Sequence, residues 1–262
     1  LCQYILPSGL WINVDNQEHE QLEHLVKDSK FVITIFDSSF DYNIYQSPDT
    51  LGQFYLSILK LIEKNPGWNG IVKSKDYSFA SLAILPCAEE VIQKMKLLIS
   101  ANRLIVLDPL VSPIAAFVYS HLSVCYGLNS AGIIAGIYGY RAIHWDCCGW
   151  LHHPFYRDKE QKIVFHSLDE FEQAIYQASN GDTSIGDFTR WRKLFNYFED
   201  LKAPQRFAEF IQEFMEEVVK TNDASHSLST SVDKYIRRNN ITDDLFELEN
   251  YWEDELIRKE SL

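Results

Sequence analysis

The sequence predicts an α/β protein built on a doubly wound, mostly parallel β-sheet. Short β-branched runs that end in small polar residues alternate with amphipathic segments whose apolar residues recur every three or four positions. This alternation runs from about residue 30 to residue 181 and then stops. Strands that alternate with helices of this length pair in parallel, because each helix carries the chain back to the same end of the sheet.

The elements can be assigned in chain order. "KFVITIFDSS" (30–39) is the first strand, and "TLGQFYLSILKLIEK" (50–64) is the amphipathic helix after it. The same pattern predicts strands at 68–76, 103–109, 122–128, 141–147 and 162–167. It predicts helices at 87–102, at 112–121 with a proline near the first turn, at 129–138, and at 167–181, which opens on a serine cap and closes on glycine.

Beyond residue 185 the sequence predicts helices without strands. Segments 187–200 and 203–221 have a helical pattern, whereas "NDASHSLSTS" (222–231) has the composition of a flexible turn or linker. We therefore expect a lead-in over 1–29, an α/β domain over 30–221 and a helical tail over 222–262.

Composition narrows the class of function. The formal net charge of −13, from 37 acidic and 24 basic residues, argues against nucleic acid as a partner. The five cysteines form no paired CxxC motifs, and the sequence contains neither an apolar run of ~20 residues nor a signal peptide, so reduced thiols and a cytoplasmic location are expected. The chain starts at leucine, as a processed product or a piece of a longer polypeptide would.

The loops that follow strands are the candidate ligand sites, since open parallel sheets bind ligands beyond the carboxyl ends of their strands. The loop "DSSFDYN" (37–43) offers Asp37, Ser38, Ser39 and Asp41. The loop "KSKD" (73–76) places Lys73 and Lys75 on the same side of a strand end, where both can face a phosphate. Short side chains that only satisfy a turn, and lysines that are only solvated, are the structural alternatives.

Two later loops carry further candidates. "LDPLVSP" (107–113) holds Asp108 and Ser112 in a turn whose backbone groups can meet the edge of a base, or that simply starts a helix. In "GLNSAG" (127–132), Asn129 or Ser130 can cap the next helix, and the backbone near Ala131 can approach a phosphate. The segment matches neither GxGxxG nor a P-loop, and a closely packed helix also explains its small residues.

A cluster of histidine, tryptophan and cysteine, "HWDCCGWLHH" (144–153), invites a metal interpretation. Its spacing fits no standard zinc pattern, so we predict no metal there. The residues in question are Cys147, Cys148, His152 and His153. We expect Trp145, Trp150 and His152 to form the wall of a cleft or to pack in the core.

The order of these elements resembles a known family. "VITIFDSSFDYN", "FYLSILKLIEK", "IVKSKD" and "LSVCYGLNSAGIIAGIYGYRAIHWD" are similar to the C-terminal, donor-binding half of GT-B glycosyltransferases of bacterial surface-carbohydrate synthesis. The similarity covers about residues 30–220 and is greatest to capsule and lipopolysaccharide transferases that use CMP-activated Kdo, and more distant to CDP-glycerol glycerophosphotransferases. The matching strand pattern is Gly139, Arg141, Ala142, Ile143 and His144, with Tyr140 as an extra residue.

The resemblance implies a Rossmann-like domain that binds a CMP- or CDP-linked sugar donor, whose sugar goes to a glycan or a lipid-linked acceptor. It implies no cofactor, and an association with the membrane only through partners. It places the donor phosphate at Asn129, Ser130 and Ala131, charge at Lys73 and Lys75, and the base at "DPLVSP". The candidates for a catalytic acid or base are Asp37, Asp41 and His144. GT-B enzymes have two such domains, and we expect only the donor-binding one in this chain.

Two functions of other classes stay open. One is a nucleotide or sugar-phosphate binding module without catalysis. The other is an interaction domain that docks a partner through aromatic residues of its C-terminal helices, namely Phe188, Trp191, Phe195, Tyr197 and Phe198.

Overall fold

The computed structural model of the chain consists of two compact units, Leu1–Arg192 and Lys193–Leu262, which we describe separately. The structure describes residues 2–5, 11–14, 16–27, 29–38, 47–75, 82–147, 155, 162–195, 198, 200 and 202–241. Within these residues, no helix is both long enough and apolar enough to cross a lipid bilayer.

A six-stranded parallel sheet forms the centre of the first unit, with the strand order β5-β4-β3-β6-β7-β8. Its strands are β3 (Phe31–Phe36), β4 (Trp68–Lys73), β5 (Leu104–Val106), β6 (Leu122–Tyr126), β7 (Ala142–Trp145) and β8 (Val164–Phe165). The chain builds outward from β3 through β4 to β5, and then returns to β6 on the other side of β3. The predicted fold class, a Rossmann-like α/β domain with a parallel sheet, is confirmed.

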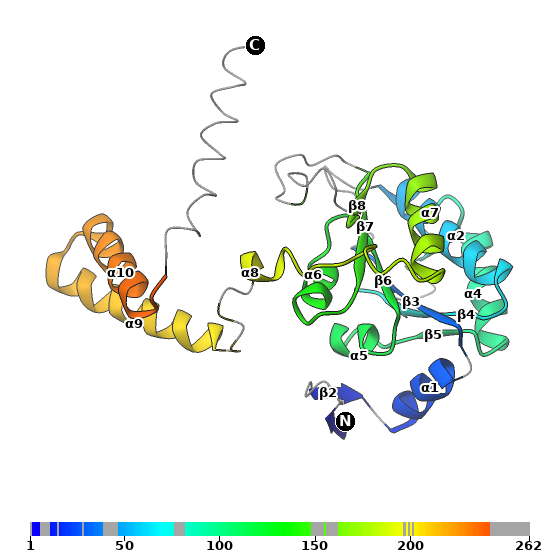
Figure 1. Cartoon of the computed structure of the whole chain (residues 1–262), viewed down its shortest axis with the longest axis horizontal. Coiled ribbons are helices and arrows are strands. Elements are labelled where there is room, and N and C mark those ends of the chain that lie inside the picture. The colour runs from blue at the N-terminus through cyan, green and yellow to red at the C-terminus, as the bar shows by residue number, and fades with distance from the viewer. Residues whose placement is uncertain are drawn as a thin grey trace, which may run out of the picture. The chain divides into compact units, whose positions relative to one another are not determined.

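Helices cover both faces of this sheet (Figure 1). One layer contains α2 (Pro48–Lys64), α4 (Ala88–Ser100) and α7 (Leu168–Ser179), and the other contains α5 (Pro113–Phe117) and α6 (Ser130–Ile137). Alternate residues of each strand enter the two layers. In β3, for example, Ile33 and Ile35 belong to the core beneath α2, whereas the Thr34 hydroxyl donates a hydrogen bond to the carbonyl of Ala116 in α5 (3.0 Å).

Trp145 belongs to the core rather than to a cleft. Its side chain is buried and stacks on Phe54 of α2 with the ring planes 8° apart. The packing alternative for this residue is therefore the correct one.

Helix α6 lies unusually close to its neighbours because of its glycines. A Cβ atom at Gly132 would overlap the Cys125 thiol of β6, and one at Gly136 would overlap the ring of Phe188. Only glycine fits at both positions, so the small residues of this segment have a packing function.

Replacing Gly136 with alanine is expected to lower the free energy of unfolding by about 1–2 kcal/mol, because overpacking a tight contact outweighs the ~1 kcal/mol gain in helix propensity. The Phe188 ring that the new methyl group would meet is itself buried. Chemical denaturation measures the loss, and the exposed Ser130→Ala in the same helix is the control with little expected change. A Gly136→Ala variant as stable as the wild type would show that Phe188 has room to move.

The N-terminal segment holds more structure than the lead-in we expected. Strands β1 (Cys2–Ile5) and β2 (Trp11–Val14) form an antiparallel hairpin, and α1 (Asn16–Lys27) follows. The helix predicted over 187–200 is wrong in its first part. The Asp187 carboxylate accepts hydrogen bonds from the N–H and hydroxyl of Thr189, which stabilises a turn, and among the described residues of this range only α8 (Arg192–Phe195) is helical.

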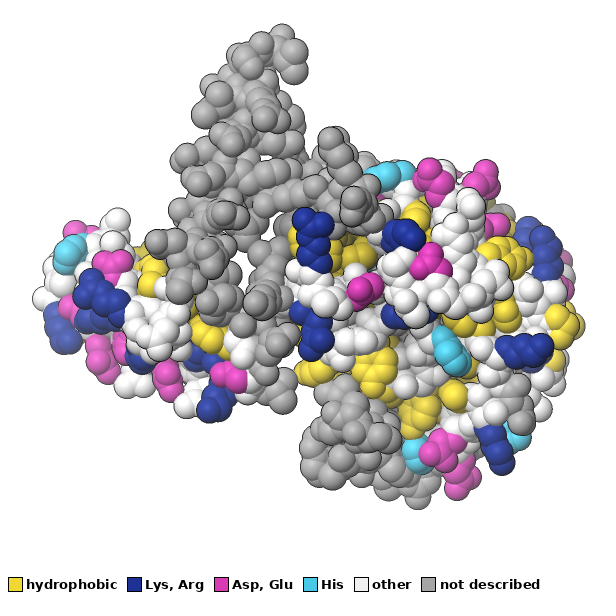
Figure 2. All heavy atoms as spheres, in the orientation of Figure 1, with side chains coloured by type: hydrophobic (Ala, Val, Ile, Leu, Met, Phe, Trp, Pro, Cys, Tyr) yellow, Lys and Arg dark blue, Asp and Glu magenta, His cyan; other side chains and the backbone are white. Residues whose placement is uncertain are grey.

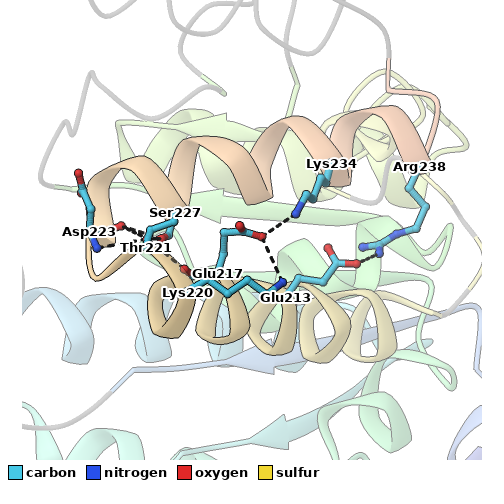
Figure 3. Close-up of polar contacts among 8 residues, drawn as sticks. All are labelled: Glu213, Glu217, Lys220, Thr221, Asp223, Ser227, Lys234 and Arg238. Carbon is cyan, nitrogen blue, oxygen red and sulfur yellow. Dashed lines mark hydrogen bonds and ion pairs between the residues drawn. The ribbon is translucent and has the colours of Figure 1, made fainter.

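The second unit contains a helical hairpin of α9 (Ala203–Thr221) and α10 (Ala224–Arg238). Polar contacts join the two helices (Figure 3): Lys234 pairs with Glu217 at 2.7 Å, and Arg238 pairs with Glu213. The flexible turn or linker predicted over 222–231 is wrong for most of its length, because the turn is confined to the first two of these residues. Asn222 has a left-handed backbone, and Asp223 then caps α10 by accepting the His226 N–H (3.0 Å).

On the face shown in Figure 2, acidic and basic side chains are interspersed over both units. The side of α9 that α10 does not cover exposes apolar side chains at four-residue spacing. They are Phe207, Ile211, Met215 and Val219. By contrast, the docking candidates Phe188 and Trp191 are buried in the first unit and therefore cannot dock a partner.

Candidate functional site

A cleft of about 570 Å³ opens at the carboxyl ends of the central strands. Loops that follow β3, β4, β5 and β6 line it, and it lies where the strand order reverses between β3 and β6. This is the position at which open parallel sheets bind ligands. The catalytic candidate Asp37 and most of the predicted binding residues meet here, namely Ser38, Lys73, Lys75, Ser112, Asn129, Ser130 and Ala131.

Asp37 forms the floor of this cleft and is 3% exposed. Its carboxylate accepts hydrogen bonds from the hydroxyls of Tyr55 and Ser74, both at 2.6 Å, and from the N–H of Lys75 at 2.8 Å. Burial raises the pKa of the Asp37 carboxyl, while these hydrogen bonds and the charge of Lys73 oppose the rise. A carboxylate engaged in this way is better suited to hold loops in place than to abstract a proton.

Lys73 is a buried cation next to this carboxylate. Its ammonium group donates to the carbonyls of Ser74 (3.1 Å) and Pro109 (3.0 Å), which join the ends of β4 and β5. Among the described residues these are its only hydrogen-bond acceptors, so one of its three N–H groups is left for a ligand in the cleft. Burial lowers the pKa of Lys73, and the charges of Asp37 and Asp108 oppose that shift.

Lys75 has a different role, because its side chain is exposed at the same cleft. Together the two lysines make the cleft locally basic in a chain whose net charge is −13. Lys73 is thus not a solvated surface lysine, whereas that alternative stays open for the exposed Lys75. The arrangement favours an anionic ligand such as a phosphate.

The start of α6 closes the cleft on the β6 side. The Asn129 side chain caps the helix by accepting the Ala131 N–H (2.8 Å), and its amide donates to the Asp37 carbonyl (2.6 Å). This bridge fixes α6 to the end of β3. Ser130, the first residue of the helix, is exposed in the cleft beside the positive end of the helix dipole.

The loop after β5 forms the opposite wall. The Ser112 hydroxyl accepts the N–H of Ile114 (3.3 Å) and caps α5, so this residue starts a helix while it lines the cleft. Asp108 is exposed and does not belong to the lining, and its carboxylate accepts the Leu110 N–H (2.8 Å). Leu110 itself is 95% exposed and presents an apolar side chain at the cleft.

His144 lies outside the cleft, and its placement argues against the catalytic role that we predicted for it. The side chain is fully buried on β7 against Gly132 of α6, and its Nδ1 atom lies 2.9 Å from the Gly127 carbonyl. The His144 side chain points into the layer that contains α6, where it supports the turn that precedes this helix.

Several candidates lie outside the described residues. They are Ser39 and Asp41 of the first loop and Cys148, Trp150, His152 and His153 of the later cluster. Their predicted roles stay predictions.

Sequence reasoning missed two residues of the site, Tyr55 and Ser74. Both donate to Asp37, and Ser74 stands between the two lysines as the small residue that we passed over. The register of the two strands would have identified Ser74. Phe36 pairs with Lys73, so Asp37 and Ser74 are the next residues along these adjacent strands. Tyr55 is one of many apolar-pattern residues of α2, and nothing in the sequence distinguishes it.

A second hollow of about 470 Å³ lies between α1 and the edge strand β5. Its described lining is apolar or neutral apart from His24, and no lysine or arginine contributes to it. The cleft at the switch point is therefore the better site for an anion.

No protein-family model and no curated protein matches this sequence. Among solved structures, the chain is similar to one described as Staphylococcus aureus MnaA in a co-structure with UDP, with 13% sequence identity and a TM-score of 0.47. The similarity covers 78% of this chain and 51% of that one, so the chain spans about half the length of the protein that it matches.

Proposed function

We propose that this chain is the donor-binding domain of a glycosyltransferase that acts in bacterial surface polysaccharide or lipopolysaccharide synthesis. The donor is a CMP- or CDP-linked sugar, the acceptor is a glycan or a lipid-linked glycan, and the chain works in the cytoplasm, meeting the membrane only through partners. The resemblance of residues 30–220 to GT-B donor-binding halves supports this assignment.

One observation carries the proposal: a buried ammonium and an exposed helix N-terminus face the same cleft at the switch point of a parallel sheet. Lys73 and Ser130 are the residues concerned. In this proposal the donor phosphate lies between them, and the departing nucleotide is stabilised by this positive potential rather than by a dedicated metal ion. Ser112 and the exposed Leu110 then lie where the nucleoside would be held.

A binding module without catalysis is the second candidate, and the state of the acid and base candidates favours it. Asp37 and His144 are both buried, and the Asp37 carboxylate already accepts three hydrogen bonds. Asp41 lies outside the described residues. Release of free sugar from a bound nucleotide sugar, or its transfer to an acceptor, would identify an enzyme; binding without turnover would identify a module.

The test of nucleotide binding is a thermal-shift and calorimetry panel with CMP, CDP, UDP and GDP. At a ligand concentration of about a hundred times Kd, binding stabilises the folded state by about 2.7 kcal/mol, which raises Tm by roughly 5–10 °C for a chain of this size. We expect such a rise with a cytidine nucleotide. If none of the four nucleotides changes Tm at millimolar concentration, the proposal is wrong.

A further inference from the structure

Asp37 is the residue on which the walls of the cleft converge. Its carboxylate binds Tyr55 of α2 and both Ser74 and the Lys75 backbone after β4, and its carbonyl accepts from Asn129 at the start of α6. One residue therefore ties the ends of β3 and β4 to two helices. Removing its side chain would release Ser74 and Lys75, which directly follow Lys73 at the end of β4.

Asp37 also supplies negative charge where Lys73 needs it. The Lys73 ammonium is buried, and its two hydrogen-bond acceptors are carbonyl groups, which carry no net charge. A buried ammonium without a nearby anion tends to lose its proton, because desolvation disfavours the charged form. The charges of Asp37 and, to a smaller extent, Asp108 are what oppose this tendency at Lys73.

Among the residues that the structure describes, few charged or titratable groups surround this pair. Asp37 follows β3, Tyr55 comes from α2, Lys75 follows β4 and Asp108 follows β5. Helix α6 contributes no titratable side chain. Asp37 is the buried anion of the group, whereas Asp108 is exposed and screened by water.

We propose that Asp37 is the positioning residue of this cleft: its buried carboxylate holds the Ser74 hydroxyl and the Lys75 backbone N–H, and it keeps the Lys73 ammonium charged for a ligand phosphate. It thereby acts on the ligand through Lys73 and is not the proton-transfer group. The ligand half of this statement rests on the proposed function, whereas the coupling between Asp37 and Lys73 belongs to the protein alone.

The coupling is tested without ligand by following the Lys73 side chain by NMR in protein labelled with ¹³C- and ¹⁵N-lysine. The Lys73 signal is assigned from its loss in Lys73→Met. In Asp37→Asn, which keeps the shape of the side chain but removes its charge, we expect the titration midpoint of Lys73 to fall by about one pH unit, a tenfold change in its proton affinity. The matched control, Asp108→Asn, removes an exposed charge and should change the midpoint much less.

A reciprocal measurement covers the case in which Asp37→Asn does not fold. Coupling between two sites acts equally in both directions, so Lys73→Met must raise the pKa of Asp37, read from its carboxyl ¹³C shift. An unchanged Lys73 midpoint in a folded Asp37→Asn, or an unchanged Asp37 midpoint in Lys73→Met, would overturn the proposal.

Ligand binding then separates this inference from the proposed function. At a pH above the Lys73 midpoint that NMR gives for the variant, Asp37→Asn should bind the preferred nucleotide about tenfold more weakly than the wild type, and it should lose less below that midpoint, where Lys73 remains protonated. A loss of the same size above and below the midpoint would indicate a purely structural role for Asp37 and would contradict the inference. A wild-type chain that binds no nucleotide would defeat the proposed function, and the two NMR titrations would still decide the coupling.

Stability gives a separate measure of how burial changes the titration of Asp37. The pKa of Asp37 is higher in the folded chain than in the unfolded one, so its contribution to stability is fully present below the unfolded pKa and is lost as the pH rises through the folded pKa. Asparagine does not titrate. The Tm of Asp37→Asn relative to the wild type should therefore rise from pH 4 toward neutrality.

Discussion

Ser130→Trp is expected to abolish nucleotide binding while leaving the fold intact. Ser130 is the first residue of α6 and is exposed in the cleft, so an indole at this position fills the space between the helix N-terminus and Lys73. A phosphate cannot then reach either group. We expect the affinity for the preferred nucleotide to fall by about a hundredfold or more, a loss of ~2.8 kcal/mol or more.

The control for this variant is Ile134→Trp. Ile134 lies one turn further along the same helix, is 37% exposed and does not line the cleft. It receives the same indole, and we expect unchanged affinity. Calorimetry measures both variants, and their thermal unfolding without ligand shows whether each is folded. Wild-type affinity in a folded Ser130→Trp would exclude this cleft as the nucleotide site.

The fold was predictable because its signals are local and repeated. Buried parallel strands need β-branched runs, and the helices between them need apolar residues at helical spacing, so both appear in the sequence from residue 30 to 181. The convergence of four loops on one cleft follows from parallel pairing alone. Composition could not show whether a short acidic residue forms a turn or begins a helix. Asp187 and Asp223 both precede a helix-prone segment, yet Asp187 stabilises a bend and Asp223 caps a helix.

Side-chain roles within the site were less predictable, because they depend on which face of a strand each residue occupies. Position 144 alternates with the core residues Ile143 and Trp145, and only the placement of α6 decides that His144 is buried beneath a helix. Asp37 looked like a catalytic candidate because it follows a strand. Its engagement depends on the register of β3 against β4 and on a tyrosine of α2, which are contacts between segments far apart in the sequence.

Lys73→Met should weaken nucleotide binding by roughly 10- to 150-fold, the range expected when a hydrogen bond to a charged group worth ~1.5–3 kcal/mol is lost. Methionine keeps the length and apolar stem of lysine, so the packing between β4 and β5 is largely retained. Lys73 is 6% exposed, and salt screens its charge poorly. The loss should therefore persist as the salt concentration rises.

Lys75→Met is the matched comparison, with the same substitution two residues along in the same cleft. Because the Lys75 side chain is exposed, and Asp37 binds the backbone N–H that the substitution keeps, we expect less than about a fivefold loss, and one that shrinks in high salt. Calorimetric titrations of both variants at low and high salt measure the difference. Equal losses in the two variants, or a larger loss for Lys75, would mean that the ligand binds at the surface of the cleft, and that burial of Lys73 serves only to join the ends of β4 and β5.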